Sequence, residues 1–154
     1  IIPYNFVSQL EKWLTKDRGI IGIDAPSVIK VEDCSSETMT FLDREIALKS
    51  IVYRNWGFGI VIAGHKESYH NIPENIRIWY GDDYLVQMNN EVGKVNYVID
   101  DIPIFTKMSA TSDLEEFNEI KNVDMLMYNR IIKWCGTQRP MKKGKTNGKS
   151  KSNS

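Results

Sequence analysis

Apolar residues near the start of the chain recur at the spacing of an amphipathic helix. Within residues 4–15 they stand four, three and one positions apart, so a helix over this stretch would present one apolar face. Gly19 follows and is a suitable residue to end the helix. The next apolar run, residues 20–23, is typical of a short buried strand. The apolar residues of the helical pattern are Phe6, Leu10, Trp13 and Leu14.

The middle of the chain has the pattern of strands, because β-branched and aromatic residues concentrate there between short polar interruptions. Strands that short loops connect must pair as antiparallel neighbours, since parallel pairing needs a long crossover. The pattern therefore predicts an antiparallel β-meander of about four to six strands. Residues 41–47 fit either a short helix or a strand. The first predicted strand region covers residues 51–53 and 56–63. The other predicted strands are residues 76–80, 84–88 and 94–99, the last with a continuation at 102–106. Turns are expected at residues 81–83 and 89–93.

A second helix is predicted toward the carboxyl end. Ser112 and Glu115 have the spacing of a capping box, in which each side chain satisfies a free backbone N–H of the other residue. An apolar stripe follows, which Asp124 interrupts, and Gly136 is a suitable residue to end the helix. The resulting fold class is α+β, with an N-terminal and a C-terminal helix that flank the sheet and cover one of its faces. The stripe consists of Leu114, Phe117, Ile120, Met127, Ile131 and Trp134.

The chain divides into two parts of opposite charge. Its 154 residues include 20 basic and 20 acidic side chains, so the formal charge is zero. Residues 137–154, however, hold six basic side chains and no acid, which leaves residues 1–136 with a formal charge of −6. We expect residues 1–136 to form a single acidic domain. Residues 137–154 should form a disordered basic tail, because this stretch has little apolar surface to bury.

Metal, redox and membrane functions have little support in the sequence. Cys34 and Cys135 stand far apart and outside any C-x-x-C motif, and His65 and His70 lie in a polar segment without a third ligand at zinc spacing. We therefore expect free thiols, no metal and no cofactor. No apolar run approaches the roughly 20 residues that span a bilayer, so we expect no membrane partner and a cytoplasmic location. The start at Ile1 lacks both Met and the plan of a signal peptide, which indicates a fragment or a processed chain.

Motifs that would indicate an enzyme are incomplete. Gly57 and Gly59 are not followed by the third glycine and helix of a dinucleotide site. Asp82 and Asp83 resemble the acidic pair of polymerase sites, but no second acidic motif stands on a neighbouring strand. Glu91 would complete a cation-binding nuclease cluster with that pair, yet it falls in an expected hairpin loop. We expect no catalytic activity, and a hydrolase or nuclease is the last of three alternatives.

Aromatic residues indicate a second class of function, the binding of nucleic acid, because such side chains can sandwich a nucleobase or an RNA cap. Adjacent Trp79 and Tyr80 would face opposite sides of a strand, so one of them is expected in the core. The acidic domain would repel phosphate, which leaves the basic tail to contact nucleic acid. The alternative function is therefore a nucleic-acid or RNA-cap-binding domain cut from a larger protein, such as a viral one. The aromatic residues concerned are Trp56, Phe58, Tyr69, Trp79 and Tyr80.

Several short segments of the sequence have motifs in common with one known family: residues 83–88 (DYLVQM), 93–101 (GKVNYVIDD), Ser109 and residues 112–117 (SDLEEF). Together they resemble the SUKH superfamily, best known as immunity proteins of bacterial toxin–antitoxin systems. Its members show a strand, a Gly-x-Val-Tyr-like turn, an aspartate-rich strand end and a serine-led helix with phenylalanine. Here Asn96 precedes Tyr97 in place of the direct Val-Tyr pair, and the Leu-Pro-x-x-Tyr entry helix and Asn-Gly turn of many members are not evident, so the resemblance is to a divergent member.

The resemblance implies an α+β domain that performs no chemistry and neutralises a toxin by covering it. The toxin would be a nuclease or deaminase, and a basic enzyme of this kind would be steered toward a domain of formal charge −6. We therefore expect a non-enzymatic protein-binding module, an immunity-type inhibitor, with Trp79 or Tyr80 as aromatic anchor. Gly93 would be a backbone requirement of a hairpin. The expected acidic contacts are Asp82, Asp83, Asp100, Asp101, Glu115, Glu116 and Glu119.

Overall fold

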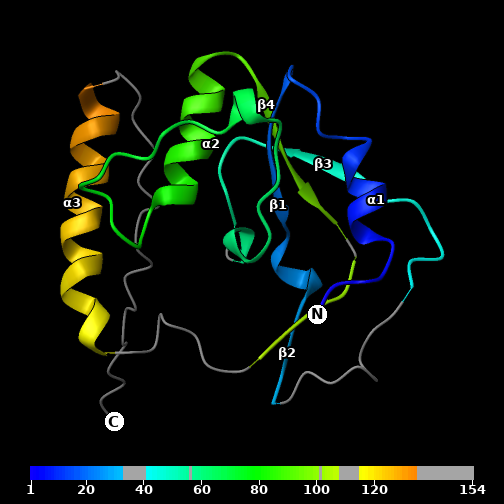
Figure 1. The fold of residues 1–154 in the computed structure, drawn as a ribbon. Helices are drawn as coiled ribbons and strands as arrows, with labels where there is room; N and C mark the ends of the chain where they lie inside the picture. The colour runs from blue at the N-terminus through cyan, green and yellow to red at the C-terminus, as the bar shows by residue number, and fades with distance from the viewer. Residues whose placement is uncertain (33–40, 56, 101, 108–114, 135–154) are drawn as a thin grey trace, which may run out of the picture.

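The computed structural model describes residues 1–32, 41–55, 57–100, 102–107 and 115–134. Within these ranges the chain forms a mixed α+β fold with three α-helices and two small open sheets (Figure 1). The α+β class and the two flanking helices are therefore confirmed. In chain order the elements are α1 (Phe6–Glu11), β1 (Arg18–Ile23), β2 (Val28–Val31), β3 (Leu48–Ile51), α2 (Gly81–Glu91), β4 (Val95–Ile99), β5 (Ile104–Lys107) and α3 (Asn118–Trp134).

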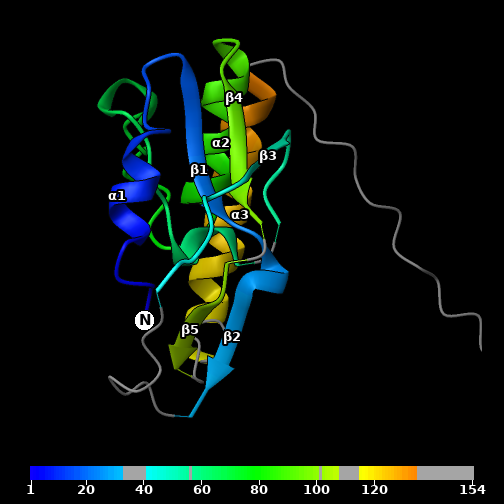
Figure 2. The ribbon, with the colours of Figure 1, turned by 90° about the vertical axis from the view of Figure 1, so that its right-hand side faces the viewer.

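The helices lie on both faces of the sheet formed by β1, β4 and β3 (Figures 1 and 2). α1 covers one face, α2 covers the other, and α3 packs outside α2. Successive residues of β1 point to opposite layers: Ile21 packs in the apolar cluster that contains Phe6 of α1, and Ile20 packs in the cluster that contains Leu85 of α2. The expectation that the helices cover a single face is therefore wrong. Because both faces are covered, β1 is apolar along most of its length rather than alternating.

The strands do not form the predicted antiparallel meander. β4 lies in the middle of its sheet, parallel to β1 and antiparallel to β3, and β2 pairs in parallel with β5 (Figure 2). In the register of β1 and β4, Ile21 stands opposite Tyr97 and Ile23 opposite Ile99. Parallel pairing is open to β1 and β4 because the chain between them includes β3, α2 and their loops, which together make a long crossover.

Helix α2 replaces the turn, strand and turn that the sequence predicts between residues 81 and 93. Its buried residues, among them Leu85, Val86 and Asn89, recur at helical spacing. Tyrosine and valine are common in strands, so the local composition pointed to the wrong structure. The predicted strand at 84–88 is therefore wrong.

Gly93 has the positive φ expected of a turn glycine, but it stands after a helix and not in a hairpin between two strands. Its φ of 76° lies in the left-handed region that favours glycine. It follows the end of α2 and begins the turn into β4, where a hairpin between two strands was expected. Two further predicted strands are wrong. The described part of residues 56–63 forms a short 3₁₀ helix and an isolated bridge, and residues 76–80 form no strand.

Phe58 closes the α2 side of the sheet. Its side chain is fully buried and lies directly on Gly22 of β1. A Cβ atom at position 22 would overlap the aromatic ring, so glycine is required there by close approach. The segment after β3 is thereby held against the sheet beside α2.

α3 confirms the predicted C-terminal helix. Among the side chains of α3 whose burial is described, the buried ones are Asp124, Tyr128 and Ile132, so the acid that interrupts the predicted apolar stripe lies on the buried face. Ser112 of the predicted capping box, both cysteines and the basic tail lie outside the described residues. In the part of the chain that is described, no helix has both the length and the apolar character needed to cross a bilayer.

Candidate functional site

Polar side chains from separate parts of the chain meet at the first turn of α2. Arg54, which follows β3, places its Nε atom 2.6 Å from Oδ2 of Asp83 and 3.1 Å from Oδ2 of Asp82. The side chain of Asp83 is 2% exposed, whereas those of Asp82 and Arg54 are 17% and 25% exposed. One guanidinium therefore holds two neighbouring carboxylates, and Asp82 is the member of the acid pair that solvent reaches.

The local structure of the chain explains why both acids stand at this position. The first N–H groups of a helix carry partial positive charge, which favours carboxylates in the first turn. The N–H of Asp83 donates to Oδ1 of Asp82 at 3.0 Å. Tyr80, at the start of the helix, has a φ of 66°, a strained conformation for a residue with a side chain. Its ring stacks on Tyr128 of α3 with the centroids 5.3 Å apart, which holds the turn in place.

A further carboxylate lies at the carboxyl ends of β1 and β4. Asp24 directly follows β1, is buried, and donates its backbone N–H to the carbonyl of Ile99 at the end of β4. Asn55 donates from Nδ2 to Oδ1 of Asp24 at 3.1 Å. Because Asn55 adjoins Arg54, the same short segment contacts Asp24 and the first turn of α2. In open parallel α/β sheets, ligands bind beyond the carboxyl ends of the strands, and Asp24 stands at that position on the parallel pair of β1 and β4. We call Asp24, Arg54, Asn55, Asp82 and Asp83 the α2 carboxylate site.

Burial is the main influence on the protonation of Asp82. Loss of solvent raises the pKa of its carboxyl group, Arg54 acts in the opposite direction, and Asp83 adds to the rise. The net pKa lies above the ordinary value for aspartate, so the group is a stronger proton acceptor than an exposed aspartate. The backbone of Gly59 borders the same carboxylate, since a Cβ atom at Gly59 would lie 3.0 Å from Oδ2 of Asp82.

The segment that precedes α2 is attached to α3 through Asp124. Its Oδ2 accepts hydrogen bonds from the backbone N–H groups of Arg77, Ile78 and Trp79 at 3.1, 2.8 and 2.8 Å. Burial acts to raise the pKa of Asp124, but these three donors outweigh it and the net pKa is lowered. Lys121 of the same helix lies 5.2 Å from the ring centroid of Trp79. Trp79 is therefore held against α3.

Within the described ranges, no three or more His, Cys, Asp or Glu side chains lie close enough together to hold a metal ion. His65 lies at the start of a short 3₁₀ helix, and its Nδ1 accepts a hydrogen bond from the N–H of Glu67 at 3.3 Å. This histidine therefore has a local role in the loop.

The residues predicted to contact a partner are not brought together as one surface. The group at the start of α2 contacts other parts of the chain, and it consists of Trp79, Tyr80, Asp82 and Asp83. A second group is exposed on other segments, and it consists of Asp100, Glu115 and Glu119. Asp101 and the side chain of Glu116 lie outside the described part of the chain.

The aromatic residues considered for stacking on a nucleobase are also dispersed. Phe58 is buried under the sheet, and one face of Tyr80 is covered by Tyr128. Tyr69 is exposed, and Trp56 is outside the described residues. The described residues therefore do not assemble the predicted aromatic sandwich.

Sequence reasoning missed four residues that the structure makes central. The sequence does mark two of them. Asp24 stands at the end of an apolar run and Asp124 stands within an apolar stripe, and a charged residue that is buried in such a place requires partners. The sequence does not mark Arg54 and Asn55, since their contacts are with segments far away along the chain.

Comparison with known proteins found no match to this chain among protein-family models, curated proteins or solved structures. The SUKH resemblance therefore stays a proposal, and the geometry of the molecule carries the functional argument.

Proposed function

We propose that the α2 carboxylate site is an acid–base site that binds a hydroxyl-bearing substrate and removes a proton from it. The observation that carries this proposal is the arrangement around Asp82, a partly exposed carboxyl group of raised pKa that shares Arg54 with the more deeply buried Asp83. Displaced pKa values at partly buried groups are typical of functional sites.

The neighbouring residues have distinct supporting roles in this proposal. Arg54 is held by Asp83 and in turn holds Asp82, so the carboxylate that receives the proton has a defined orientation. A general base acts best when its pKa is close to the working pH, and a rise above the ordinary value moves Asp82 in that direction. Asn55 and Asp24, at the ends of the parallel strands, supply an amide and a carboxylate that can orient a polar substrate.

The substrate class follows from the hydrogen-bonding character of the site. Ionised carboxylates only accept hydrogen bonds, so Asp82 and Asp24 favour donors such as hydroxyl groups. A hydroxyl or water that loses its proton to Asp82 becomes a nucleophile, which suits hydrolysis or the transfer of a group to an alcohol.

A carboxyl-detected NMR titration of the full chain tests this function. We expect Asp82 to titrate above the ordinary aspartate range, and hydroxylated probes such as ribose, glucose and glycerol 3-phosphate to shift the resonances of Arg54 and Gly59. Asp82→Asn should abolish the shifts caused by the probes. Asp100→Asn, which changes an exposed acid elsewhere, should leave them unchanged. An ordinary titration of Asp82, together with no probe-dependent shift, would contradict the proposal.

The second candidate is the protein-binding function expected from the SUKH resemblance, an immunity-type inhibitor of a basic nuclease or deaminase toxin. The exposure of Asp100, Glu115 and Glu119 and the formal charge of −6 over residues 1–136 favour it. If it holds, a basic enzyme encoded beside this gene should bind the chain, and charge reversal at Asp100 and Glu119 should slow association. RNA binding that survives removal of residues 137–154 would instead favour the nucleic-acid alternative.

A further inference from the structure

A hollow beside α1 is a second place where charged and aromatic side chains converge. It is lined by side chains from α1 and the turn after it, the start of β1 and the segment before β3. α1 lies on the face of the sheet opposite α2 (Figure 1). The volume of the hollow is about 240 Å³, which is small beside the roughly 300–1,000 Å³ of most ligand pockets. The lining residues are Gln9, Lys12, Trp13, Arg18, Glu45 and Ile46.

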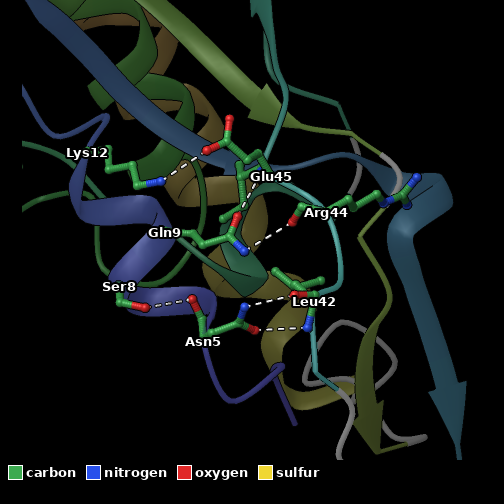
Figure 3. Close-up of polar contacts among 8 residues, drawn as sticks. Asn5, Ser8, Gln9, Lys12, Leu42, Arg44 and Glu45 are labelled. Carbon is green, nitrogen blue, oxygen red and sulfur yellow. Dashed lines mark hydrogen bonds and ion pairs between the residues drawn. The ribbon is translucent and has the colours of Figure 1, made fainter.

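Gln9 builds one wall of the hollow. Its Nε2 donates to the carbonyl of Arg44 at 3.0 Å, and its Oε1 accepts from the N–H of Ile46 at 2.8 Å (Figure 3). Both the nitrogen and the oxygen of the Gln9 amide are therefore hydrogen-bonded, and they hold residues 44–46 on the opposite side of the hollow. At the rim, Lys12 and Glu45 form an exposed ion pair at 3.2 Å.

Arg18 provides the charge inside the hollow. Its guanidinium carbon lies 4.6 Å from the ring centroid of Trp13 and 5.6 Å from that of Tyr97, so aromatic rings hold the group. Its Nη1 reaches the carbonyl of Trp13 at the long distance of 3.5 Å. Among the described residues no carboxylate forms an ion pair with Arg18. The guanidinium therefore keeps donors for an anion.

We propose that this hollow binds a small carboxylate ligand with a planar apolar body. A guanidinium and a carboxylate match as two parallel hydrogen bonds, and a planar ring bound in the hollow would lie beside Trp13. The volume restricts the ligand to about the size of a single ring. This site is independent of the α2 carboxylate site, and the two proposals can fail separately.

Titration of the full chain with sodium benzoate, followed by NMR, tests the proposal. Saturable shifts are expected at the indole N–H of Trp13 and the Nε–H of Arg18. Arg18→Gln should weaken binding by about tenfold or more, because it removes a charge-assisted contact. Lys16→Gln removes the same charge from an exposed neighbour outside the hollow and should leave the affinity unchanged. Shifts that do not saturate, or equal affinities of the two variants, would overturn the proposal.

Glu45→Gln is a second variant for the case in which Arg18→Gln does not fold. It alters an exposed rim residue, and loss of its negative charge should tighten benzoate binding. Inorganic phosphate should bind more weakly than benzoate because it has no ring to place against Trp13. Unchanged affinity in Glu45→Gln, or tighter binding of phosphate than of benzoate, would refute a site for an aromatic carboxylate.

Discussion

Asp82 and Asp83 are adjacent in sequence and contact the same arginine, yet their surroundings give them opposite effects on stability. The raised pKa of Asp82 means that its ionised form is less favourable in the folded chain than in the unfolded one. Its contribution to stability is therefore complete below the unfolded pKa of about 3.9 and is lost as pH rises through the folded pKa. Asp83 is the more deeply buried partner of Arg54. Removing its charge would weaken the pairing of a partly buried cation.

We expect Asp82→Asn to maintain or increase the free energy of unfolding at pH 8, and Asp83→Asn to lower it by about 1–3 kcal/mol. The gain from Asp82→Asn should be smaller at pH 4, because the folded pKa of Asp82 lies above the ordinary value and its carboxyl group takes up a proton more readily in the folded chain than in the unfolded one. Urea unfolding of both variants at the two pH values measures this. A larger loss of stability in Asp82→Asn than in Asp83→Asn would show that Asp82 serves the fold rather than a site.

At the scale of elements, two side-chain amides attach α1 and its preceding residue to the segment before β3. It has six residues, too few for an isolated helix to be stable in water. Asn5 pairs with both the N–H and the carbonyl of Leu42 at 2.9 Å, and Gln9 pairs in the same way with Arg44 and Ile46 (Figure 3). The two amides stand four residues apart on one side of the helix. They bond the backbone N–H and carbonyl groups of residues 42–46, as the backbone of a neighbouring strand would.

Asn5→Ala and Gln9→Ala should each lower the free energy of unfolding by about 1–2 kcal/mol. The first change removes two partly buried hydrogen bonds, and the second removes one partly buried and one exposed hydrogen bond. Hydrogen exchange should also become faster at the N–H of Leu42 in the first variant and of Ile46 in the second. Ser8→Ala is the matched control, because its exposed hydroxyl bonds within its own turn. Equal exchange rates in the control and in the two variants would refute this role for the amides.

At the scale of the whole molecule, Asp124 attaches the outer helix layer to the rest of the fold. Its lowered pKa means that the ionised form stabilises the folded chain above the unfolded pKa of about 3.9, and that this stabilisation is lost as pH falls toward the folded pKa. The carboxylate is fully buried and satisfies three backbone donors that would otherwise lack partners.

Asp124→Asn should lower the free energy of unfolding by about 2–4 kcal/mol at neutral pH, because a neutral amide bonds these donors more weakly. The difference from the unchanged chain should narrow below about pH 4, where the carboxyl group of residue 124 binds a proton in the unfolded chain more readily than in the folded one. Thermal unfolding between pH 3 and 7 measures this, with Glu119→Gln as an exposed acid of the same helix for comparison. A difference that does not vary with pH would contradict the assigned role of the charge.

Elements that depend on local pattern were predicted well, and those that depend on distant contacts were not. Phe6 and Leu10 marked α1, and the run 94–99 marked β4, because burial of one face or of a short strand leaves a period in the sequence. The strand predicted at residues 84–88 is wrong, because β-branched and aromatic residues are typical of strands. In the folded chain these residues form part of α2, which lies between the sheet and α3. Of the candidate site, the sequence singles out Asp82 and Asp83 as partner contacts, which stays a prediction, whereas their contacts with Arg54 are visible in the tertiary structure alone.

The sequence by itself determined the α+β class, the amphipathic helices at both ends, and the division into an acidic segment and a basic tail, because these follow from composition and from spacing over a few residues. The parallel pairing of β1 with β4, the placement of Arg54 between two carboxylates and the burial of Asp124 were decided by the tertiary structure. Each of these joins residues that lie far apart along the chain. Their energy comes from contacts and desolvation that exist once the layers have packed, and no local pattern records them.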